Sequence, residues 1–301
     1  MADPWHFEKL HLRSGLTLQV AQAGQGSGKP LVVMLHGFPE CWYSWRHQLR
    51  ALEPHFECVA PDLRGYGESD APVGVENYSL DKLIGDVADL IEACGHQRAI
   101  VMAHDWGGAI AWAIALQRPE LVERLIVLNC PHLKKFRDSL RSNPRQILKS
   151  WYILFFQIPR LPEMILRARN FAVLKRMLHD SAVQKSAFND EDLAHYRAAF
   201  RNPYSITAAI NYYRALFREN FRNRQNPEWM DRKIAAATMV IWGEQDVALR
   251  KELTFGMKER FSGAFEIHYV SDSGHWVQQE KPEVVNQLVL EFLGAGKNAT
   301  T

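Results

Sequence analysis

Three ionisable residues each follow a short apolar run, and their order along the chain suits nucleophilic catalysis. They are Asp105, Asp246 and His275. A carboxylate can attack an electrophilic carbon, and a histidine held by a second carboxylate can activate water against the ester that forms. The order nucleophile, acid, histidine favours Asp105 as the nucleophile, His275 as the general base and Asp246 as its orienting partner. Glu244 and Asp272 are the nearest competitors for that last role.

The segment 99–108, AIVMAHDWGG, predicts a strand that runs into a sharp turn, with a helix over 109–117. Gly107 and Gly108 allow a strained turn and close helix packing, and Asp105 stands at its apex. Hydrolases of esters carry serine at that place. A carboxylate there indicates attack on a strained or activated sp3 carbon, and so cleavage of a carbon–oxygen or carbon–halogen bond. The alternative is that Asp105 only caps the helix.

A turn after an earlier apolar run could supply part of an oxyanion hole. It covers residues 36–40, HGFPE, and could aim the amide of Phe38 at the site beside the amide of Trp106. Two converging N–H groups would stabilise the tetrahedral intermediate formed when water attacks an ester of Asp105.

Alternating apolar segments predict the sheet that must hold these residues. Residues 5–12 and 16–23 predict an antiparallel hairpin. Short apolar runs then alternate with helical periods, which predicts a mostly parallel sheet whose strands are buried on both faces. Those runs cover 31–35, 58–60, 100–103, 125–128, 239–242 and 265–270. The clearest helix follows an N-cap at Ser79 and stops at Gly95. Since open parallel sheets bind ligands at the carboxyl ends of their strands, the three ionisable residues can meet there.

The alternation stops between about 132 and 232, where the chain becomes helical and prolines at 144, 159, 162 and 203 divide the helices. We expect a helical cap over 132–232, inserted after the sixth strand of a core formed by 1–131 and 233–301. The stretch 132–230 holds 18 Lys or Arg against 8 Asp or Glu, whereas the rest holds 18 against 26. A basic stretch can attract anionic substrates or a membrane surface, but a solvated helical face is the simpler interpretation.

The composition is that of a globular protein, with 47% hydrophobic and 23% charged residues and a net charge of +2 that selects no partner. The sequence contains no nucleic-acid-binding motif, and its four cysteines match no metal-ligand spacing. Residues 1–10 lack an apolar signal region, and the longest apolar stretch, 151–156, is too short to span a bilayer. We therefore expect a cytoplasmic protein that makes no membrane contact.

Together these motifs resemble those of the α/β-hydrolase epoxide hydrolases. The similarity runs from the first hairpin to near the C-terminus and includes 36–40, 62–69 (DLRGYGES), 104–108 and the segment around His275. It implies an α/β-hydrolase fold, with a mostly parallel central sheet flanked by helices and an inserted helical cap. It also implies conversion of an epoxide and water into a vicinal diol through an ester on Asp105. No metal or organic cofactor is implied, because the chain itself supplies nucleophile and base.

The family's cap carries two tyrosines that hydrogen-bond the epoxide oxygen and protonate the leaving alkoxide. Tyr152 matches the first and Tyr213 the second, with Tyr212 left open as an alternative to Tyr213. Because an alkoxide is a far stronger base than a phenolate, acids with a pKa of about 10 suit this task. Without the resemblance, these residues would be interpreted as core aromatics of the cap helices.

The resemblance further implies a cis bond between Phe38 and Pro39, and places Glu40 and His104 near the hydrolytic water. We expect a small apolar epoxide as substrate, because the cap residues predicted to line the pocket are apolar. They are Trp151, Phe155, Phe156, Ile158 and Leu161. Fatty-acid epoxides suit the basic cap and aromatic epoxides the aromatic lining, and the sequence leaves this choice open. Detoxification is the corresponding expected role.

Two other functions use the same fold. A haloalkane or haloacid dehalogenase could employ the same groups, with the amide of Trp106 holding the halide. Fluoroacetate-type relatives, however, carry Arg right after the nucleophile and an acid after the next strand, where this chain has Trp106 and Asn129. Haloalkane-type relatives usually have another residue in place of Phe38, and need no tyrosine acids. The second alternative is a non-catalytic ligand-binding receptor, against which the intact nucleophile, acid and histidine argue.

Overall fold

The apolar runs form one eight-stranded sheet in the computed structural model, which describes residues 5–26, 28–222 and 227–295. The strand order is β1-β2-β4-β3-β5-β6-β7-β8. Strands β1 and β2 form the predicted antiparallel hairpin, β2 joins β4 antiparallel, and the remaining pairs are parallel. The bounds are β1 His6–His11, β2 Thr17–Ala23, β3 Leu31–Leu35, β4 Glu57–Pro61, β5 Ala99–His104, β6 Val122–Leu128, β7 Ala237–Gly243 and β8 Phe265–Val270.

Burial along the strands follows their place in the sheet. The central strands β3 and β5 are buried at every residue, as the unbroken apolar runs predict. The expectation of burial on both faces is wrong for β8, where Tyr269 stays 42% exposed. This strand lies at the edge of the sheet and has β7 as its single neighbour, so fewer helices cover it.

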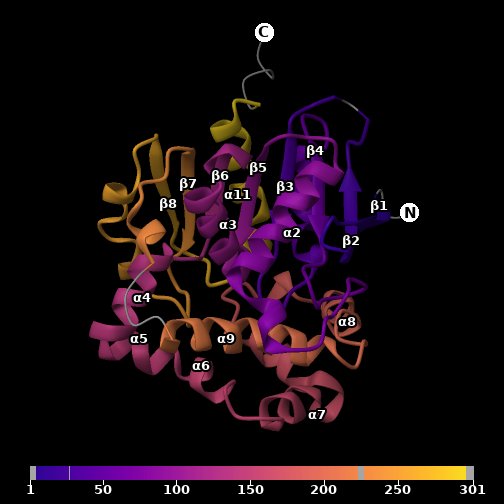
Figure 1. The fold of residues 1–301 in the computed structure, drawn as a ribbon, viewed down its shortest axis with the longest axis vertical. Coiled ribbons are helices and arrows are strands. Elements are labelled where there is room, and N and C mark those ends of the chain that lie inside the picture. Colours follow the sequence, from indigo (N-terminus) through magenta and orange to yellow (C-terminus); the bar gives the residue numbers. More distant parts are fainter. Residues whose placement is uncertain (1–4, 27, 223–226, 296–301) are drawn as a thin grey trace.

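Helices cover both faces of the sheet and enclose two apolar clusters. Helices α2 and α3 pack against one face, while α1 and α11 pack against each other on the opposite face (Figure 1). The predicted start and stop of α2 are confirmed, with Ser79 as N-cap and Gly95 in a left-handed conformation. The helices that flank the sheet on its two faces are α1 Arg46–Leu52, α2 Leu80–Ala93, α3 Asp105–Gln117, α10 Val277–Glu280 and α11 Pro282–Leu293.

The segment between β6 and β7 is helical, as the sequence predicts, and lies along one edge of the molecule (Figure 1). Its helices are α4 Leu133–Ser142, α5 Pro144–Lys149, α6 Trp151–Phe155, α7 Leu161–Lys175, α8 Asp190–Ala198 and α9 Ser205–Arg222. The four prolines fall at or between helix ends, because proline lacks the N–H that a helix interior requires. Helix α7 is broken by non-helical backbone over 168–171. We call this segment the cap; its exact boundaries at 132 and 232 stay a prediction.

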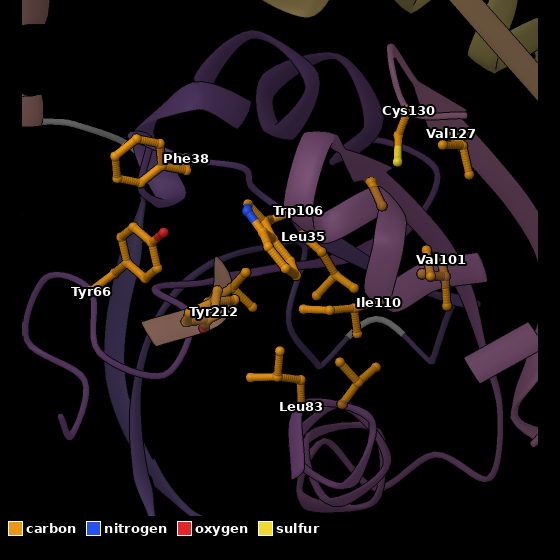
Figure 2. Packing of buried hydrophobic residues seen from close by; sticks show 14 of the residues in the cluster. Leu35, Phe38, Tyr66, Leu83, Val101, Trp106, Ile110, Val127, Cys130 and Tyr212 are labelled. Carbon is orange, nitrogen blue, oxygen red and sulfur yellow. The ribbon is translucent and has the colours of Figure 1, made fainter. Parts of the chain in front are cut away.

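The cap and the core share part of one apolar cluster beneath the strand ends. Trp106, at the start of α3, lies in the middle of this cluster, with Phe38, Tyr66 and Tyr212 around it (Figure 2). Its ring packs edge-on against Tyr212, which comes from the cap helix α9. Packing across this cluster therefore helps to hold the cap over the end of β5.

Candidate active site

Asp105 stands at the junction of β5 and α3, in a backbone conformation that few residues other than glycine adopt. Its φ is 47°, which places it in the left-handed region. Close packing stabilises this turn, since the amide of Gly107 donates to the His36 carbonyl oxygen at 3.0 Å. A Cβ atom at Gly107 would lie 2.1 Å from the Leu35 carbonyl oxygen, so only glycine fits. The predicted turn is confirmed, but the helix begins at Asp105 itself rather than at 109.

The turn over residues 36–40 is held by its own side chains. The ring of His36 donates from Nδ1 to the Gly37 carbonyl oxygen and accepts from the amide of Leu63 at Nε2. This pattern needs a neutral ring, and burial lowers the pKa of His36 to about 4. The Gly37 amide donates to Glu40, and the Phe38-Pro39 bond is cis, as the resemblance implies.

Both carboxylate oxygens of Asp105 have a neighbour. Oδ1 accepts the amide hydrogen of Phe38 at 3.0 Å, and Oδ2 lies 3.5 Å from Nε2 of His275. Burial acts to raise the pKa of Asp105, but the hydrogen bond and charge of His275 hold it below its ordinary value. The side chain is therefore an ionised carboxylate at neutral pH, as a nucleophile must be.

His275 is held firmly on its other side by Asp246. The distance from Nδ1 to Oδ2 of Asp246 is 2.6 Å. The second oxygen of Asp246 accepts the backbone amides of Ala248 and Leu249. Burial acts to lower the pKa of His275, but the charge of Asp246 and the contact with Asp105 raise it well above its ordinary value. The ring is thus fixed, with one nitrogen turned toward the nucleophile.

Two apolar cavities meet at Asp105, and both are also lined by Tyr152 and Tyr213. The larger has a volume of about 480 Å³ and the smaller about 70 Å³. The larger one is lined further by Phe38, Trp151, Phe155, Phe156, Ile165, Leu166, Val173, Met177, Ser181, Val247, Ala248, His275 and Trp276. The smaller is completed by Trp106, Ala109, Cys130, Pro131, Leu133, Phe136, Ile153, Leu216 and Leu249.

The two tyrosines come from different cap helices and pack edge-to-face in the wall of the cavities that Asp105 also lines. Tyr152 belongs to α6 and Tyr213 to α9, and their ring centroids lie 5.8 Å apart. Burial, followed by the charge of Asp105, raises the pKa of both hydroxyls. They are therefore neutral hydrogen-bond donors at the wall of the site.

The sequence and the structure of this chain are similar to those of known hydrolases. The family described as alpha/beta hydrolase fold matches residues 30–282. Epoxide hydrolase 4 of Homo sapiens is 39% identical over 284 residues, covering 93% of this chain and 76% of that protein. The AB hydrolase superfamily protein YfhM of Bacillus subtilis is 39% identical over 281 residues, covering 93% and 95%. The crystal structure of the Bacillus megaterium epoxide hydrolase with an inhibitor is similar at a TM-score of 0.86 and 32% identity, covering 96% of this chain and all of that one.

The chain belongs to the epoxide hydrolases of the α/β-hydrolase fold. The fold class and the family expected from the sequence are thereby confirmed.

Among the residues predicted to act in this epoxide hydrolase site, the structure brings together Asp105, His275, Asp246, Tyr152 and Tyr213. Phe38 and Trp106 flank the nucleophile, and Phe156 packs against Phe38 and Tyr213 at the wall of the larger cavity. The roles of these residues in catalysis stay predictions.

The structure separates Tyr212 from Tyr213. The hydroxyl of Tyr212 is buried in the core, donates to the Arg64 carbonyl oxygen at 2.8 Å, and reaches neither cavity. Of the two neighbours, therefore, only Tyr213 is placed to meet a substrate.

Glu40 and His104 lie behind Asp105 and His275 rather than in the wall of either cavity. Nδ1 of His104 lies 2.7 Å from Oε2 of Glu40, and its Nε2 lies 2.8 Å from the backbone carbonyl oxygen of His275. Both side chains are fully buried. Their predicted contact with the hydrolytic water is untested, but the pair does support the segment that carries the base.

Two residues predicted to line the pocket do not. Ile158 and Leu161 remain 44% and 41% exposed and belong to neither cavity. They lie near Pro159 and Pro162, where the chain passes from α6 to α7 and the helical phase is lost. Their side chains consequently point outward, unlike those of Phe155 and Phe156.

Sequence reasoning gave no supporting role to Asn129, which joins two strands beneath the base. Its amide nitrogen donates to Oδ2 of Asp246 at 2.8 Å, and its amide oxygen accepts from the Gly243 amide. Its position in the sequence could have indicated this role, because Asn129 directly follows an apolar run, as Asp105 does.

Two glutamines that support Glu40 were also missed. Gln278 and Gln279 both donate to its Oε1 atom, at 2.9 and 2.8 Å. They follow His275 in the chain, and they belong to no sequence motif that would have predicted this contact.

The competitors of Asp246 lie at the surface. Glu244 pairs with Lys251, and Asp272 pairs with Lys281. Within the described part of the chain, no group of three metal-ligating side chains is close enough to hold a metal ion. No helix among the described residues is long and apolar enough to cross a membrane.

Proposed function

We propose that this protein hydrolyses apolar epoxides to vicinal diols through a covalent ester on Asp105. The observation that carries the proposal is one shared space: the Asp105 carboxylate, the His275 ring and the Tyr152 and Tyr213 rings all line the larger cavity. A nucleophile, a base and two acids thus face the same substrate.

In the first step, Asp105 attacks a carbon of the epoxide and the carbon–oxygen bond of the ring breaks. Since Oδ1 already accepts the Phe38 amide, Oδ2 is the attacking atom and Oδ1 becomes the ester carbonyl oxygen. Tyr152 and Tyr213 hydrogen-bond the epoxide oxygen, and one of them gives its proton to the alkoxide. The two hydroxyls also hold the ring in line for attack.

In the second step, His275 takes a proton from water, and the hydroxide attacks the carbonyl carbon of the ester. The charge on Oδ1 of the tetrahedral intermediate is stabilised by the amides of Phe38 and Trp106. Collapse breaks the bond to the diol oxygen and restores the Asp105 carboxylate. The hydroxyl group taken from water gives its proton to the departing diol oxygen as the carboxylate re-forms, and protonated His275 returns the remaining proton to the tyrosinate, so the cycle closes.

Asp246, Asn129, His104 and Glu40 act as positioning residues in this scheme. Asp246 fixes the tautomer in which Nε2 of His275 accepts the proton from water. His104 bonds to Glu40 and to the backbone carbonyl oxygen of His275, and so holds the segment that carries the base. A fixed His275 in turn keeps the hydrolytic water within reach of its Nε2 atom.

Unequal cavities support an epoxide with one larger and one smaller apolar substituent. The larger cavity has room for an aromatic ring or a short chain, and the smaller has a mostly apolar lining. Removal of varied reactive epoxides, a detoxifying role, fits such a lining. A cytoplasmic location is part of the same proposal, since all four thiols are free.

The decisive experiment measures diol formation from styrene oxide and an epoxide of stearate, beside matched alkyl halides and fluoroacetate. Asp105→Asn keeps the shape of the side chain and tolerates its left-handed backbone, and should form no diol. Asp272→Asn, a surface carboxylate paired with Lys281, is the matched control and should be fully active. Halide release without diol would make the protein a dehalogenase, and binding without turnover would make it a receptor.

A further inference from the structure

The outer surface of helices α5, α6 and α7 exposes large apolar side chains that the catalytic scheme does not use. We call this surface the cap outer face, and define it by Leu148, Trp151, Leu154, Ile158, Leu161 and Met164. Leu148 is 75% exposed and Met164 67%. Ile158 lies in the link between α6 and α7, and the other five belong to the three helices. The three helices run along the edge of the molecule farthest from the sheet (Figure 1).

Exposed apolar residues elsewhere are mostly isolated, as Val73 is in the loop before α2. Single exposed apolar residues are normal, but a concentration of them on one surface of a soluble fold marks a place of contact. The cap outer face is therefore a candidate contact surface.

The charges on the stretch of chain that carries this face are almost entirely positive. Residues 139–178 contain eight Lys or Arg and a single acidic residue, Glu163. The Glu163 carboxylate is bound by Arg214 at 2.7 Å, while Arg145, Arg160 and Arg169 are exposed. An apolar surface with a basic surround is complementary to an anionic phospholipid bilayer.

The larger cavity opens on the same side of the molecule. Its lining includes Trp151, Ile165 and Val247, which are 60%, 41% and 55% exposed. Trp151 thus belongs both to the cavity mouth and to the cap outer face. A tryptophan in this position suits the boundary between headgroups and acyl chains.

We propose that the cap outer face docks on the surface of an anionic phospholipid bilayer, with the mouth of the larger cavity turned toward the lipid. Leucine and methionine side chains enter the acyl boundary while the arginines contact phosphate groups. Apolar substrates then pass from the bilayer into the cavity, a consequence that rests on the proposed function. The proposal departs from the sequence-based expectation of no membrane contact, and it rests on the exposure of these side chains.

A second copy of the chain fits this face less well. A symmetric dimer places the same surface on both partners, so the basic residues of each copy would face those of the other. Repulsion between these positive charges disfavours pairing of two copies, whereas the negative phosphate headgroups of a bilayer neutralise the same charges.

The test is sedimentation of the full-length protein with vesicles, with no epoxide present. We expect binding to vesicles of phosphatidylglycerol and phosphatidylcholine, little binding to phosphatidylcholine alone, and weaker binding when sodium chloride is raised to about 0.5 M. Replacing Leu148, Leu154 and Met164 together by serine should lower the partition coefficient at least about tenfold. None of the three lines a cavity.

Two further variants complete the design. Arg145→Gln with Arg160→Gln should lower the partition coefficient about fivefold for each charge removed. Val73→Ser removes an apolar side chain that is 80% exposed but lies outside the cap, and should bind as the wild type does. Unchanged thermal unfolding of the triple serine variant shows that it folds.

Failure of vesicle binding through this face, or assignment of the face to a second copy, overturns the proposal. The first outcome is a wild-type protein that stays in the supernatant with anionic vesicles, or a triple variant that binds them equally well. The second outcome is a dimer that the triple variant dissociates while vesicles bind neither form, which would assign the face to a second copy. Because vesicle binding is measured without substrate, failure of docking is distinct from failure to form diol.

Discussion

The Nε2 atom of His275 lies 3.5 Å from Oδ2 of Asp105, whereas Nδ1 of the same ring lies 2.6 Å from Oδ2 of Asp246. The ring is therefore tightly bound to its orienting carboxylate and only loosely approached by the nucleophile. This asymmetry suits a base that must leave Asp105 free to react first, and then activate water against the ester.

Replacing the base should separate the two steps. In His275→Gln we expect the ester on Asp105 to form but not to be hydrolysed, because the side chain proposed to take a proton from water is removed. Intact-protein mass spectrometry after exposure to styrene oxide should show one added substrate mass, located on the peptide that contains Asp105. An unmodified variant protein would contradict the two-step scheme.

The two steps should also differ in their dependence on pH. Two carboxylates raise the pKa of His275 in the free protein, and formation of the ester removes the charge of Asp105, so this pKa falls in the intermediate. Ester hydrolysis should therefore rise with pH until His275 is neutral, and then level off. Ester formation should stay constant down to about pH 5, because the pKa of Asp105 is below its ordinary value. Single-turnover kinetics measure both rates, and a parallel loss of the two in acid would be inconsistent with these assignments.

The cap tyrosines should govern ester formation. Tyr152→Phe and Tyr213→Phe should each slow this step about 100-fold, with little effect on hydrolysis of an ester already formed. Tyr212→Phe is the matched control, since its hydroxyl binds the Arg64 carbonyl oxygen instead of facing the cavity. It should cost about 1 kcal/mol of unfolding free energy and retain the wild-type rate. Wild-type rates in both cap variants would remove these tyrosines from the mechanism.

Glycine at position 37 should be essential for the placement of the nucleophile. A Cβ atom there would lie 2.4 Å from Cβ of Asp105, so Gly37→Ala must displace Asp105 or the turn that carries the Phe38 amide. Displacement by about 1 Å costs on the order of 100-fold in rate. Gly85→Ala, in α2, has no atom within 4 Å of the added carbon and should be active and more stable by about 1 kcal/mol. Rate assays beside thermal unfolding of both variants test this contrast.

Asn129 should affect the base through Asp246. Asn129→Gly removes the side chain but tolerates the φ of 40°, so it isolates the lost hydrogen bonds to Asp246 and to the Gly243 amide. We expect a loss of about 2 to 3 kcal/mol of unfolding free energy. Ester hydrolysis should slow more than ester formation, because Asp246 then holds His275 less rigidly. Equal slowing of both steps would point to a general structural effect.

The sheet, the helical segment between β6 and β7, and the meeting of Asp105, Asp246 and His275 at one edge of the sheet could be predicted from the residues alone. Unbroken apolar runs are long enough to form strands and too short to form helices, and parallel strands bring their carboxyl ends to one edge. Residues that directly follow such runs, such as Asp105 and His275, therefore lie close together at that edge. Their proximity does not depend on how the surrounding side chains pack.

Which cap residues face the cavities depends on packing between elements that are distant in the sequence. Tyr212 and Tyr213 are adjacent on α9, so their side chains diverge by about 100°, and packing against the core sends one hydroxyl to Arg64 and the other to the cavity. Ile158 and Leu161 lie where prolines break the helical phase, so no periodicity tells their inward side from their outward side. Apolar character is a property of each residue, but exposure depends on how short helices are rotated against the rest of the fold, which distant contacts set.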